Sequence, residues 1–396
     1  QDMTPNIIHA VLARVEGAPK GTKGISLFIV PKVLVNADGS LGERNSVYCG
    51  SIEKKMGNKG NATCVMNFDG ATGFLLGEEN HGLEIMFNIM NTARIGTALQ
   101  GMTLAQLSFQ GALQYARDRL QMRSLTGAKN PDGEADPIIV HPDVRRMLMT
   151  QKALVEGQRA FVYWMAQLVD VTKYGNEEAA KAADDLLGLL TPIAKAFCTE
   201  TAIEATNIGI QVYGGHGYIH EHGMEQVVRD CRISAIWEGT TGIQALDLIG
   251  RKVMGSGGAL LRNFTKIVHK FCEAHQHEEA MAGFCTALAG LNKQWGELTV
   301  AIGEKAMQDA EEVGAASVDY TMYSGYIVLG YLWARMAQVA QAKIAAGQDN
   351  DGFYAAKVAT AQFYFARLLP RAGMHHAAAL AGAGTVMALA EDKFAF

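Results

Sequence analysis

Three long stretches of helical periodicity, separated by short polar breaks, most constrain how this chain can fold. In the first, from Leu83 to about Met122, apolar residues recur at spacings of three and four, as they do along the buried face of a helix. A second stretch begins near His141, and a third spans roughly Ala179 to Gln211. Because long helices joined by short breaks pack side by side, these stretches predict an antiparallel helix bundle.

The segment that follows the third stretch changes character. Val212 to Gly223 is too rich in glycine to continue a long helix, and we expect a shaped loop there. A short helix and a second turn come next, and then a last bundle helix that has Thr240 or Thr241 near its N-terminus. The small, flexible run Gly255 to Gly258 is the best candidate for a linker.

The two flanks of the predicted bundle differ from it and from each other. From Asn6 to about Leu76, runs of β-branched residues bounded by glycine, asparagine and aspartate predict antiparallel strands, with a turn at Asn36 to Ser40. Beyond Gly258, helical periodicity continues to the end of the chain, which predicts an extra all-helical domain. The fold class is therefore α+β and mainly α.

Composition excludes several functional classes. Of the 396 residues 49% are apolar and 19% are charged, and the formal net charge of -5 argues against an intrinsic surface for nucleic acid or anionic membranes. The six cysteines show no CxxC spacing, which favours free thiols in a reducing compartment. The longest strongly apolar run, Tyr326 to Trp333, is far shorter than the about 20 residues of a bilayer span, so no transmembrane helix is expected.

Several polar residues have both a chemical and a structural interpretation. The cluster from His216 to His222 has the residue types of a metal site, but the glycines around it argue against the regular helix that would bring those side chains together. Arg94, Arg117 and Arg119 are either phosphate ligands or surface residues paired with acids such as Asp118. Glu238 is either a base or a carboxylate that stabilises a helix N-terminus.

The order of the motifs is more informative than any one of them. The longest is QVYGGHGYIHEHGMEQVVRDCRISAIWEGTTGIQ, from Gln211 to Gln244, which resembles the C-terminal signature of the acyl-CoA dehydrogenase family almost position by position. Further matches occur in the family's order from Ile7 to Val253, namely GISLFIVPK, KKMGNKGNATCVMNFDG, LLGEENHGL, ARIGTALQG and YARDR. The region beyond Gly258 is similar to the C-terminal extension of the larger family members.

The resemblance implies a flavoprotein that holds FAD and removes the α- and β-hydrogens of an acyl-CoA thioester to give a trans-2-enoyl-CoA. It implies part of the middle β domain at 1–80, a four-helix-bundle domain at 81–255 and an extra helical domain at 256–396. The family's N-terminal helical domain would then be missing from this sequence. It also implies a homo-oligomer, either a dimer or a tetramer, and an electron-transferring flavoprotein as acceptor. Neither nucleic acid nor a membrane is an expected partner, and the expected location is the cytoplasm, or the mitochondrial matrix in a eukaryote.

The resemblance also assigns roles to individual residues. Glu238 matches the family's catalytic base, whereas the base position used in another branch is occupied here by Ala93, which cannot titrate. Gly239 matches a residue that contacts the thioester, and Arg94 matches one near the coenzyme A arm. The matches to flavin-binding positions are Thr240, Arg119, Gln121, Gln211, Gly214 and Gly215, of which the last three correspond to contacts with the adenine half of a flavin bound mainly by the neighbouring subunit. No metal ligand is implied.

Four positions depart from the family pattern. Met122 and Arg123 replace its usual Phe-Gly pair, Gln226 replaces an arginine, and Gly242 replaces a larger residue. Two other functions remain open: an acyl-CoA oxidase, and a family member of the DNA-associated alkylation-response type.

Overall fold

The computed structural model describes residues 3–395, apart from the side chain of Asn88. The chain forms two compact units, Gln1–Ala93 and Arg94–Phe396, and each is described here separately. The division falls within the first long helix. The three-domain division expected from the sequence therefore stays a prediction.

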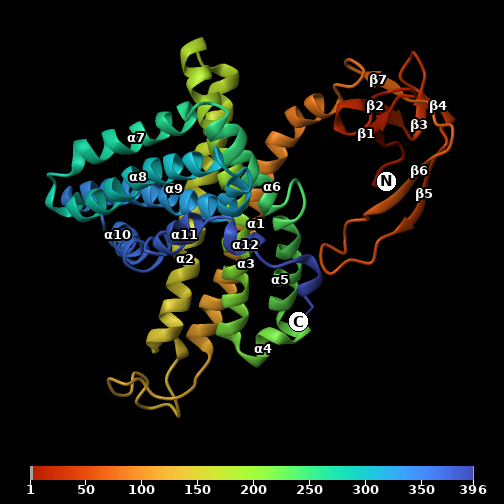
Figure 1. Ribbon diagram of the computed structural model, residues 1–396. Helices are drawn as coiled ribbons and strands as arrows, with labels where there is room; N and C mark the ends of the chain where they lie inside the picture. Colours follow the sequence, from red (N-terminus) through yellow and green to blue (C-terminus); the bar gives the residue numbers. More distant parts are fainter. Residues whose placement is uncertain (1–2, 396) are drawn as a thin grey trace. The chain divides into compact units, whose positions relative to one another are not determined.

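The first unit contains short antiparallel strands, as predicted, and they are coloured red to orange in Figure 1. One sheet has the order β1-β2-β7, and two further pairs are β3 with β4 and β5 with β6. The strand bounds are Ile8–Arg14 (β1), Ile25–Pro31 (β2), Val33–Val35 (β3), Leu41–Arg44 (β4), Val47–Ile52 (β5), Cys64–Phe68 (β6) and Phe74–Leu76 (β7). The predicted turn joins β3 to β4, where the Asn36 amide donates to the Ser40 carbonyl at 2.9 Å.

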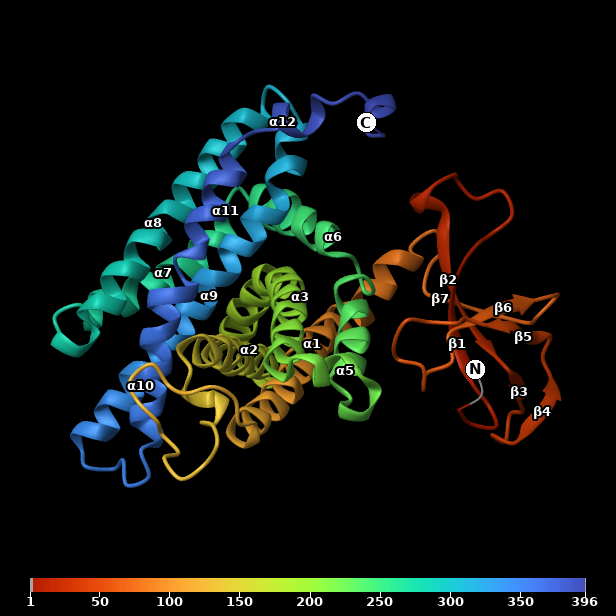
Figure 2. The ribbon, with the colours of Figure 1, turned by 90° about the horizontal axis from the view of Figure 1, so that it is seen from below.

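The predicted bundle is present in the second unit, where α2 and α3 lie side by side (Figure 2). Its long helices are Gly82–Asp118 (α1, which begins in the first unit), Pro142–Tyr174 (α2) and Glu177–Tyr213 (α3). Shorter helices follow at Gly215–Tyr218 (α4), Met224–Arg232 (α5) and Thr241–Leu246 (α6), and α6 continues as a π-helix, Asp247–Met254 (η5). Three single turns of 3-10 helix lie at Ile138–Val140 (η2), His220–His222 (η3) and Ile233–Ala235 (η4).

One expectation about this region was partly wrong. The segment from Val212 to Gly223 is not a loop throughout, because it contains the single helical turns α4 and η3. Gly214 has a φ of +59° and ends α3, and the chain then re-enters helical geometry at once. Glycine therefore prevents a long helix here without preventing one turn of helix.

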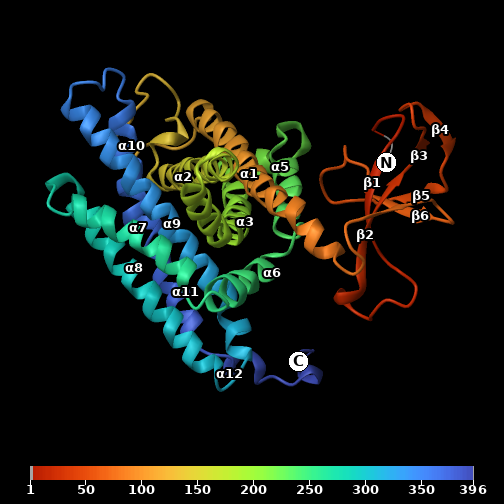
Figure 3. The ribbon, with the colours of Figure 1, turned by 90° about the horizontal axis from the view of Figure 1, so that it is seen from above.

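The C-terminal helices pack directly on the bundle, with α9 between the two sets (Figure 3). Their bounds are Ala259–His275 (α7), Glu279–Ala306 (α8), Glu311–Ala345 (α9), Phe353–Phe363 (α10), Tyr364–Leu368 (η6), Arg371–Leu380 (α11), Gly384–Met387 (α12) and Glu391–Lys393 (η7). A single core runs through both sets and includes Phe161, Phe197 and Trp333. The Trp333 indole donates to the Ala153 carbonyl at 3.0 Å, which links α9 to α2.

Helix α3 is long and apolar enough to cross a membrane by length and composition, although it contains no long uninterrupted apolar run. Within its most apolar window, however, 78% of the residues are buried inside the protein, as expected for a core helix. All six cysteines are free thiols, and four of them are buried: Cys198, Cys231, Cys272 and Cys285.

Candidate active site

The structure divides the predicted site residues into two groups that are far apart along α1. Arg94 lies about a third of the way along the helix, and the C-terminal end is reached at Asp118, about 35 Å away at 1.5 Å per residue. Arg94 is grouped with Glu238, Gly239 and Thr240. The second group contains Arg119, Gln121, Gln211, Gly214 and Gly215, which all line one pocket.

The first group is built on a tight turn, Trp237 to Thr240, which we call the Glu238 turn. Glu238 has a φ of +54° and Gly239 a φ of +90°, so two successive residues adopt the left-handed conformation. A side chain is rarely found in that conformation, and a Cβ at Gly239 would lie 2.4 Å from the Gln244 Nε2 atom. Thr240 then caps α6, because its hydroxyl accepts from the Ile243 amide at 3.3 Å.

Two side chains hold the backbone of this turn. The Arg94 Nε donates to the Glu238 carbonyl at 3.4 Å, and the Gln244 Nε2 donates to the same oxygen at 3.3 Å. Arg94 is buried and lies 3.7 Å from Asp247, which also pairs with Arg251 at 2.8 Å. Burial lowers the pKa of the Arg94 guanidinium, and the Asp247 carboxylate opposes that effect. The surface-residue interpretation of Arg94 is therefore wrong.

Buried polar groups surround the turn. Lys195 of α3 is fully buried, and burial lowers its pKa to about 8, while the charges of Glu200 and Glu238 oppose the shift and that of Arg94 adds to it. The Thr241 hydroxyl donates to the Glu200 carboxylate at 2.5 Å. Eight buried side-chain atoms in the described part of the chain have no hydrogen-bond partner, and three of them belong to this region: Lys195 Nζ, Trp237 Nε1 and Gln244 Oε1. Such groups are uncommon in a protein interior and are a feature of ligand sites.

Sequence reasoning missed Lys195, Gln244 and Asp247. A lysine inside the apolar run of α3 was a signal that could have found Lys195, because lysine is almost never fully buried without a reason. Gln244 and Asp247 carry no comparable local signal. Gln244 contacts the Glu238 carbonyl within one segment, whereas the contact of Asp247 with Arg94 joins the segment around α6 to α1.

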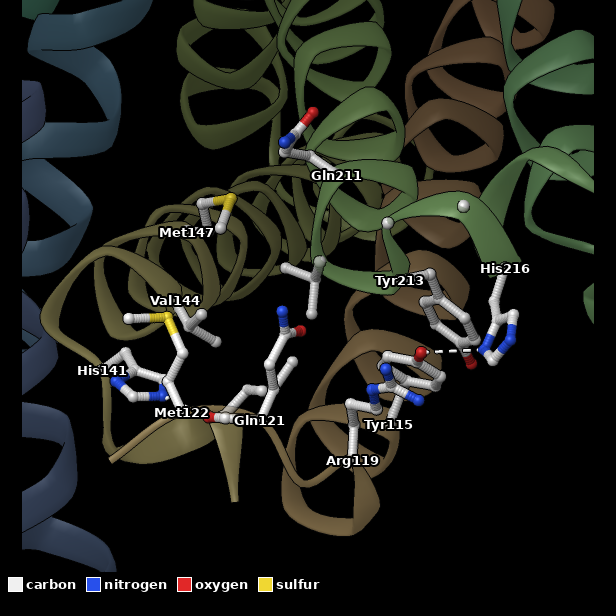
Figure 4. Close-up of a pocket in the computed structure, with 14 residues that line it drawn as sticks. Tyr115, Arg119, Gln121, Met122, His141, Val144, Met147, Gln211, Tyr213 and His216 are labelled. Carbon is white, nitrogen blue, oxygen red and sulfur yellow. Dashed lines mark hydrogen bonds between the residues drawn. The ribbon is translucent and has the colours of Figure 1, made fainter. Parts of the chain in front are cut away.

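The second group lines a cavity of about 500 Å³ between the ends of α1 and α3, which we call the α1–α3 pocket (Figure 4). Arg119 and Gln121 follow α1, and Gln211 lies in the last turn of α3. A Cβ at Gly214 or Gly215 would meet no atom within 4 Å, so the backbone there is open to a ligand. The floor is apolar and includes the nearly buried Ile138, Met147 and Val212.

Aromatic side chains form one wall of this pocket. Tyr115 stacks on Tyr213 with ring centroids 4.2 Å apart, and its hydroxyl lies 2.9 Å from the Nδ1 atom of His216. His216 in turn stacks on His222 at 4.8 Å. Partial burial raises the pKa of the Tyr213 hydroxyl. The pocket therefore offers planar apolar surface beside its cation and amides.

The histidine cluster singled out in the sequence is divided among these contacts. His220 pairs with Glu225 at 2.6 Å. Hydrogen bonds from Arg229, which has the larger effect, and from His220 lower the pKa of Glu225 to about 2. Among residues 3–395, no group of three or more histidine, cysteine or acidic side chains has a geometry suited to a metal ion.

The residues of the pocket fit a nucleotide that carries a diphosphate. Arg119 supplies a cation, Gln121 and Gln211 supply amide donors, and Gly214 with Gly215 allows close backbone approach. The cavity volume lies in the range of about 300–1,000 Å³ that is typical of small-molecule sites.

The four residues that depart from the family pattern have different structural surroundings. Met122 lines the pocket and has a φ of +59°, whereas Arg123 contacts Asp136 at 3.3 Å within the adjoining loop. Gln226 donates to Asp230 at 3.4 Å. A Cβ at Gly242 would meet nothing within 4 Å, so the smaller residue is not required by packing.

Comparisons with known proteins show which family this chain resembles. Residues 80–254 match the model of the acyl-CoA dehydrogenase C-terminal domain, and residues 264–390 match the model described as acetyl-CoA dehydrogenase C-terminal like. The chain is 40% identical over 380 residues to 3-methylmercaptopropionyl-CoA dehydrogenase of Ruegeria pomeroyi, which covers 95% of this chain and 63% of that protein. It is 35% identical over 384 residues to a broad-specificity linear acyl-CoA dehydrogenase of Mycobacterium tuberculosis, covering 93% of this chain and 63% of that protein. The chain thus spans just under two thirds of the length of these relatives.

Solved structures share the fold. Caenorhabditis elegans ACDH-11 in complex with C11-CoA has a TM-score of 0.75 at 21% identity, covering 90% of this chain and 56% of that one. A Bacillus anthracis acyl-CoA dehydrogenase complexed with FAD has a TM-score of 0.71 at 21% identity, covering 93% of this chain and 60% of that one. The helical bundle and its C-terminal addition therefore recur together in known proteins.

Proposed function

Because the chain belongs to the acyl-CoA dehydrogenase family, we propose that it carries the catalytic base and part of the FAD site of an enzyme that oxidises acyl-CoA thioesters to trans-2-enoyl-CoAs. The observation that carries this proposal is the Glu238 turn. A carboxylate-bearing residue in a left-handed conformation is held there by Arg94 and Gln244 among unsatisfied buried groups. Conformations of this kind persist where the surrounding structure maintains them, and they concentrate at functional sites.

Glu238 acts as the base in this mechanism. Its carboxylate takes the proton from the carbon next to the thioester carbonyl, and the electrons of that C–H bond form the new double bond to the β-carbon. The backbone N–H of Glu238 donates to the thioester oxygen, where negative charge develops. The chemistry that FAD supplies when bound is acceptance of the β-hydrogen with its electron pair. Arg94 acts by fixing the Glu238 carbonyl, and Gly239 and Thr240 shape the turn that contacts thioester and cofactor.

The α1–α3 pocket holds the nucleotide half of FAD in this proposal. Arg119 and Gln121 bind the diphosphate, and Gln211, Gly214 and Gly215 contact the adenine half. The separation of about 35 Å along α1 supports a homo-oligomer, a dimer or tetramer, because the two groups then serve two different FAD molecules. The pocket of one subunit would hold the nucleotide of the FAD that reacts at Glu238 of the partner subunit.

The remaining assignments follow from the family. The substrate class is an acyl-CoA thioester, and the names of the two relatives include a sulfur-containing and a linear acyl group. An electron-transferring flavoprotein is the proposed acceptor. The six free thiols are consistent with the reducing cytoplasm as the location.

Anaerobic titration of the full-length, flavin-loaded protein with acyl-CoAs of graded chain length tests this function. We expect the long-wavelength flavin absorbance to bleach with at least one of them. Absence of bleaching with every acyl-CoA would overturn the proposal and favour a family member of the DNA-associated type. If bleaching occurs, rapid recovery of the absorbance with oxygen alone identifies an oxidase, whereas recovery that needs an electron-transferring flavoprotein identifies a dehydrogenase.

A further inference from the structure

The segment between α1 and η2 places Arg119 and Gln121 at the pocket, and its two ends are paired. The Ile138 amide donates to the Arg119 carbonyl at 2.9 Å. Two residues further in, the Gln121 amide donates to the Asp136 carbonyl, and the Asp136 amide donates to the Met122 carbonyl, both at 2.9 Å. Three backbone bonds therefore align the start of this segment, which carries the pocket residues, with its end.

The residues between these ends, 123–135, which we call the Asp136 loop, are held mainly by one buried carboxylate. Asp136 is fully buried, and its oxygens accept from the amides of Ser124 at 2.8 Å, Lys129 at 2.8 Å and Asn130 at 2.7 Å. Arg123 adds a guanidinium contact at 3.3 Å. A single side chain thus gathers three backbone amides that lie 6 to 12 positions before it.

Arg123 completes the network from the other side. Its guanidinium donates to the Asn130 carbonyl at 2.8 Å and to the Gly133 carbonyl. The loop has almost no apolar packing of its own, and Leu125 within it is 90% exposed. Hydrogen bonds to a charged group are stronger than those between neutral groups, so the Asp136 and Arg123 network is the main source of order in this loop.

The loop also maintains an unfavourable conformation beside the pocket. Met122 lines the pocket with a φ of +59°, which is strained for a side chain of its size, and its carbonyl is held by the Asp136 amide. His141, at the start of α2, contacts the Gln121 carbonyl at 2.9 Å. Gln121 and Met122 are consequently positioned by their backbone contacts, and the Asp136 amide and carbonyl supply two of them.

We propose that Asp136 is a positioning residue for nucleotide binding: by closing the loop on itself, it holds Arg119, Gln121 and Met122 in the geometry of the α1–α3 pocket. This role rests on the proposed binding of FAD there. Arg123, which replaces the second residue of the family's usual Phe-Gly pair, contacts Asp136, and this network supports the pocket from outside without contacting the nucleotide.

The protonation state of Asp136 supports a constant role over the working pH range. The backbone hydrogen bond from Ser124, followed by those from Asn130 and Lys129, lowers the pKa of this carboxyl to about 2. A carboxyl whose pKa is lowered on folding stabilises the fold above its unfolded pKa of about 3.9, and this contribution is lost as the pH falls toward 2. The Asp136 carboxyl is therefore ionised at neutral pH, as the network requires.

Asp136→Asn in the full-length protein tests the inference, with ADP as the probe of the diphosphate and adenine half. The amide keeps the shape of the side chain but removes its charge and one acceptor oxygen, so we expect the dissociation constants of ADP and FAD to rise about 10- to 100-fold. Turnover at saturating FAD should remain within about twofold of wild type, because the Glu238 turn is not altered. Hydrogen exchange in the cofactor-free protein should show protected Ser124, Lys129 and Asn130 amides in wild type and rapid exchange in the variant.

Asp143→Asn is the matched control, since Asp143 is an exposed acid near the same loop that pairs with Arg146 at 2.8 Å. This control should change neither the affinity for ADP and FAD nor the exchange of the three amides. Arg123→Met should weaken ADP binding in the same direction, and Arg123→Lys should restore part of the affinity.

Two results would overturn the inference. Undiminished protection of the three amides in Asp136→Asn would show that the carboxylate does not hold the loop. Lost protection with unchanged ADP affinity would show that the loop is structural and does not position the pocket. A wild-type protein that binds neither ADP nor FAD would overturn the proposed function and the nucleotide role together, while the exchange data would still decide whether Asp136 holds the loop.

Discussion

The Glu238 turn and the α1–α3 pocket satisfy their polar groups in different ways. Around the turn, buried charges from Arg94, Lys195 and Asp247 meet, and the Nζ atom of Lys195 has no partner within the described chain. Beside the pocket, the buried Asp136 carboxylate accepts from three backbone amides and an arginine. The turn combines backbone strain with unsatisfied groups, whereas the polar groups that support the pocket are bonded.

This difference matches the two roles proposed for these regions, proton abstraction at the turn and nucleotide binding at the pocket. A base must change its protonation state during the reaction, so its surroundings retain polar groups that a substrate can engage. A nucleotide site must present the same cation and amides to the same ligand each time, so a rigid and fully bonded support is sufficient. Substitutions at the turn should therefore change turnover, and substitutions at the pocket should change affinity.

Glu238→Gln should produce the largest effect. It removes the proposed base while conserving size, so we expect turnover to fall by about 100- to 10,000-fold with thioester affinity nearly unchanged. Rapid-reaction flavin bleaching measures the step directly. Glu221→Gln, an exposed acid in η3, is the control. Near-normal bleaching in the Glu238 variant would remove this residue from the role of base.

Arg119→Gln should act at the pocket alone. Loss of the cation is expected to weaken ADP binding by about 10- to 100-fold, and the difference from wild type should shrink at high salt because the interaction is partly screened. Calorimetric titration at two salt concentrations measures both effects. Arg117→Gln, two residues earlier and outside the pocket lining, should leave the affinity unchanged. A comparable loss in the two variants would argue for general surface charge instead of a specific contact.

Lys195→Met should stabilise the protein near neutral pH. The pKa of this lysine falls from an unfolded value near 10.4 to about 8, so below pH 8 the folded state keeps a buried charge that costs on the order of 2 kcal/mol. Between pH 8 and 10 the folded wild-type protein loses this proton first, and its free energy of unfolding rises toward that of the variant. Denaturant unfolding at pH 7 and pH 10 measures the difference.

The control for this prediction is Lys181→Met, which replaces an exposed lysine on the same helix that pairs with Asp185 at 3.2 Å. A pH-independent difference between Lys195→Met and wild type would show that the amine is not a buried charge. A fall in turnover of the stabilised variant would connect Lys195 to the chemistry at the turn.

A pair of glycine variants should show the smallest effects. Gly239→Ala places a Cβ at a φ of +90° and 2.4 Å from the Gln244 amide nitrogen, and we expect a loss of about 1–2 kcal/mol in the free energy of unfolding. Gly215→Ala meets no atom within 4 Å, so it should leave stability within about 0.5 kcal/mol and reduce only ADP affinity. Equal destabilisation by the two variants would contradict the distinction between a strained turn and an open pocket.

Much of the architecture could be predicted from periodicity. The helices from Gly82, Pro142 and Glu177 begin within about two residues of the predicted positions, because three- and four-residue spacing of apolar side chains is a local property. The antiparallel strands and the Asn36 to Ser40 turn could also be predicted, because β-branched runs bounded by turn residues are a local signal. The short helices between Val212 and Gly223 were not, since a single turn of helix has no periodicity to read.

The resemblance nominated residues that the structure brings together, but their roles stay predictions, and local sequence did not predict contacts between distant segments. Five predicted cofactor residues meet at one pocket, although nearly a hundred positions separate Arg119 from Gly215 in sequence. By contrast, local sequence placed Arg94 at the surface or beside a phosphate, and the structure shows it buried against Asp247 and the Glu238 carbonyl. Lys195 and Asp136 were not singled out, because their importance depends on burial, which the packing of the whole chain determines.

The amino-acid order was enough to predict the main elements, to reveal the family resemblance and to nominate Glu238 as the base, because these depend on spacing and motif. The conformation of Glu238 and the division of the site into two groups about 35 Å apart along α1 became visible in the folded chain. So did the burial of the charges that surround and support them. The reason is physical: burial, electrostatic interaction and hydrogen-bond satisfaction depend on which segments pack together, and a linear pattern does not contain those distances.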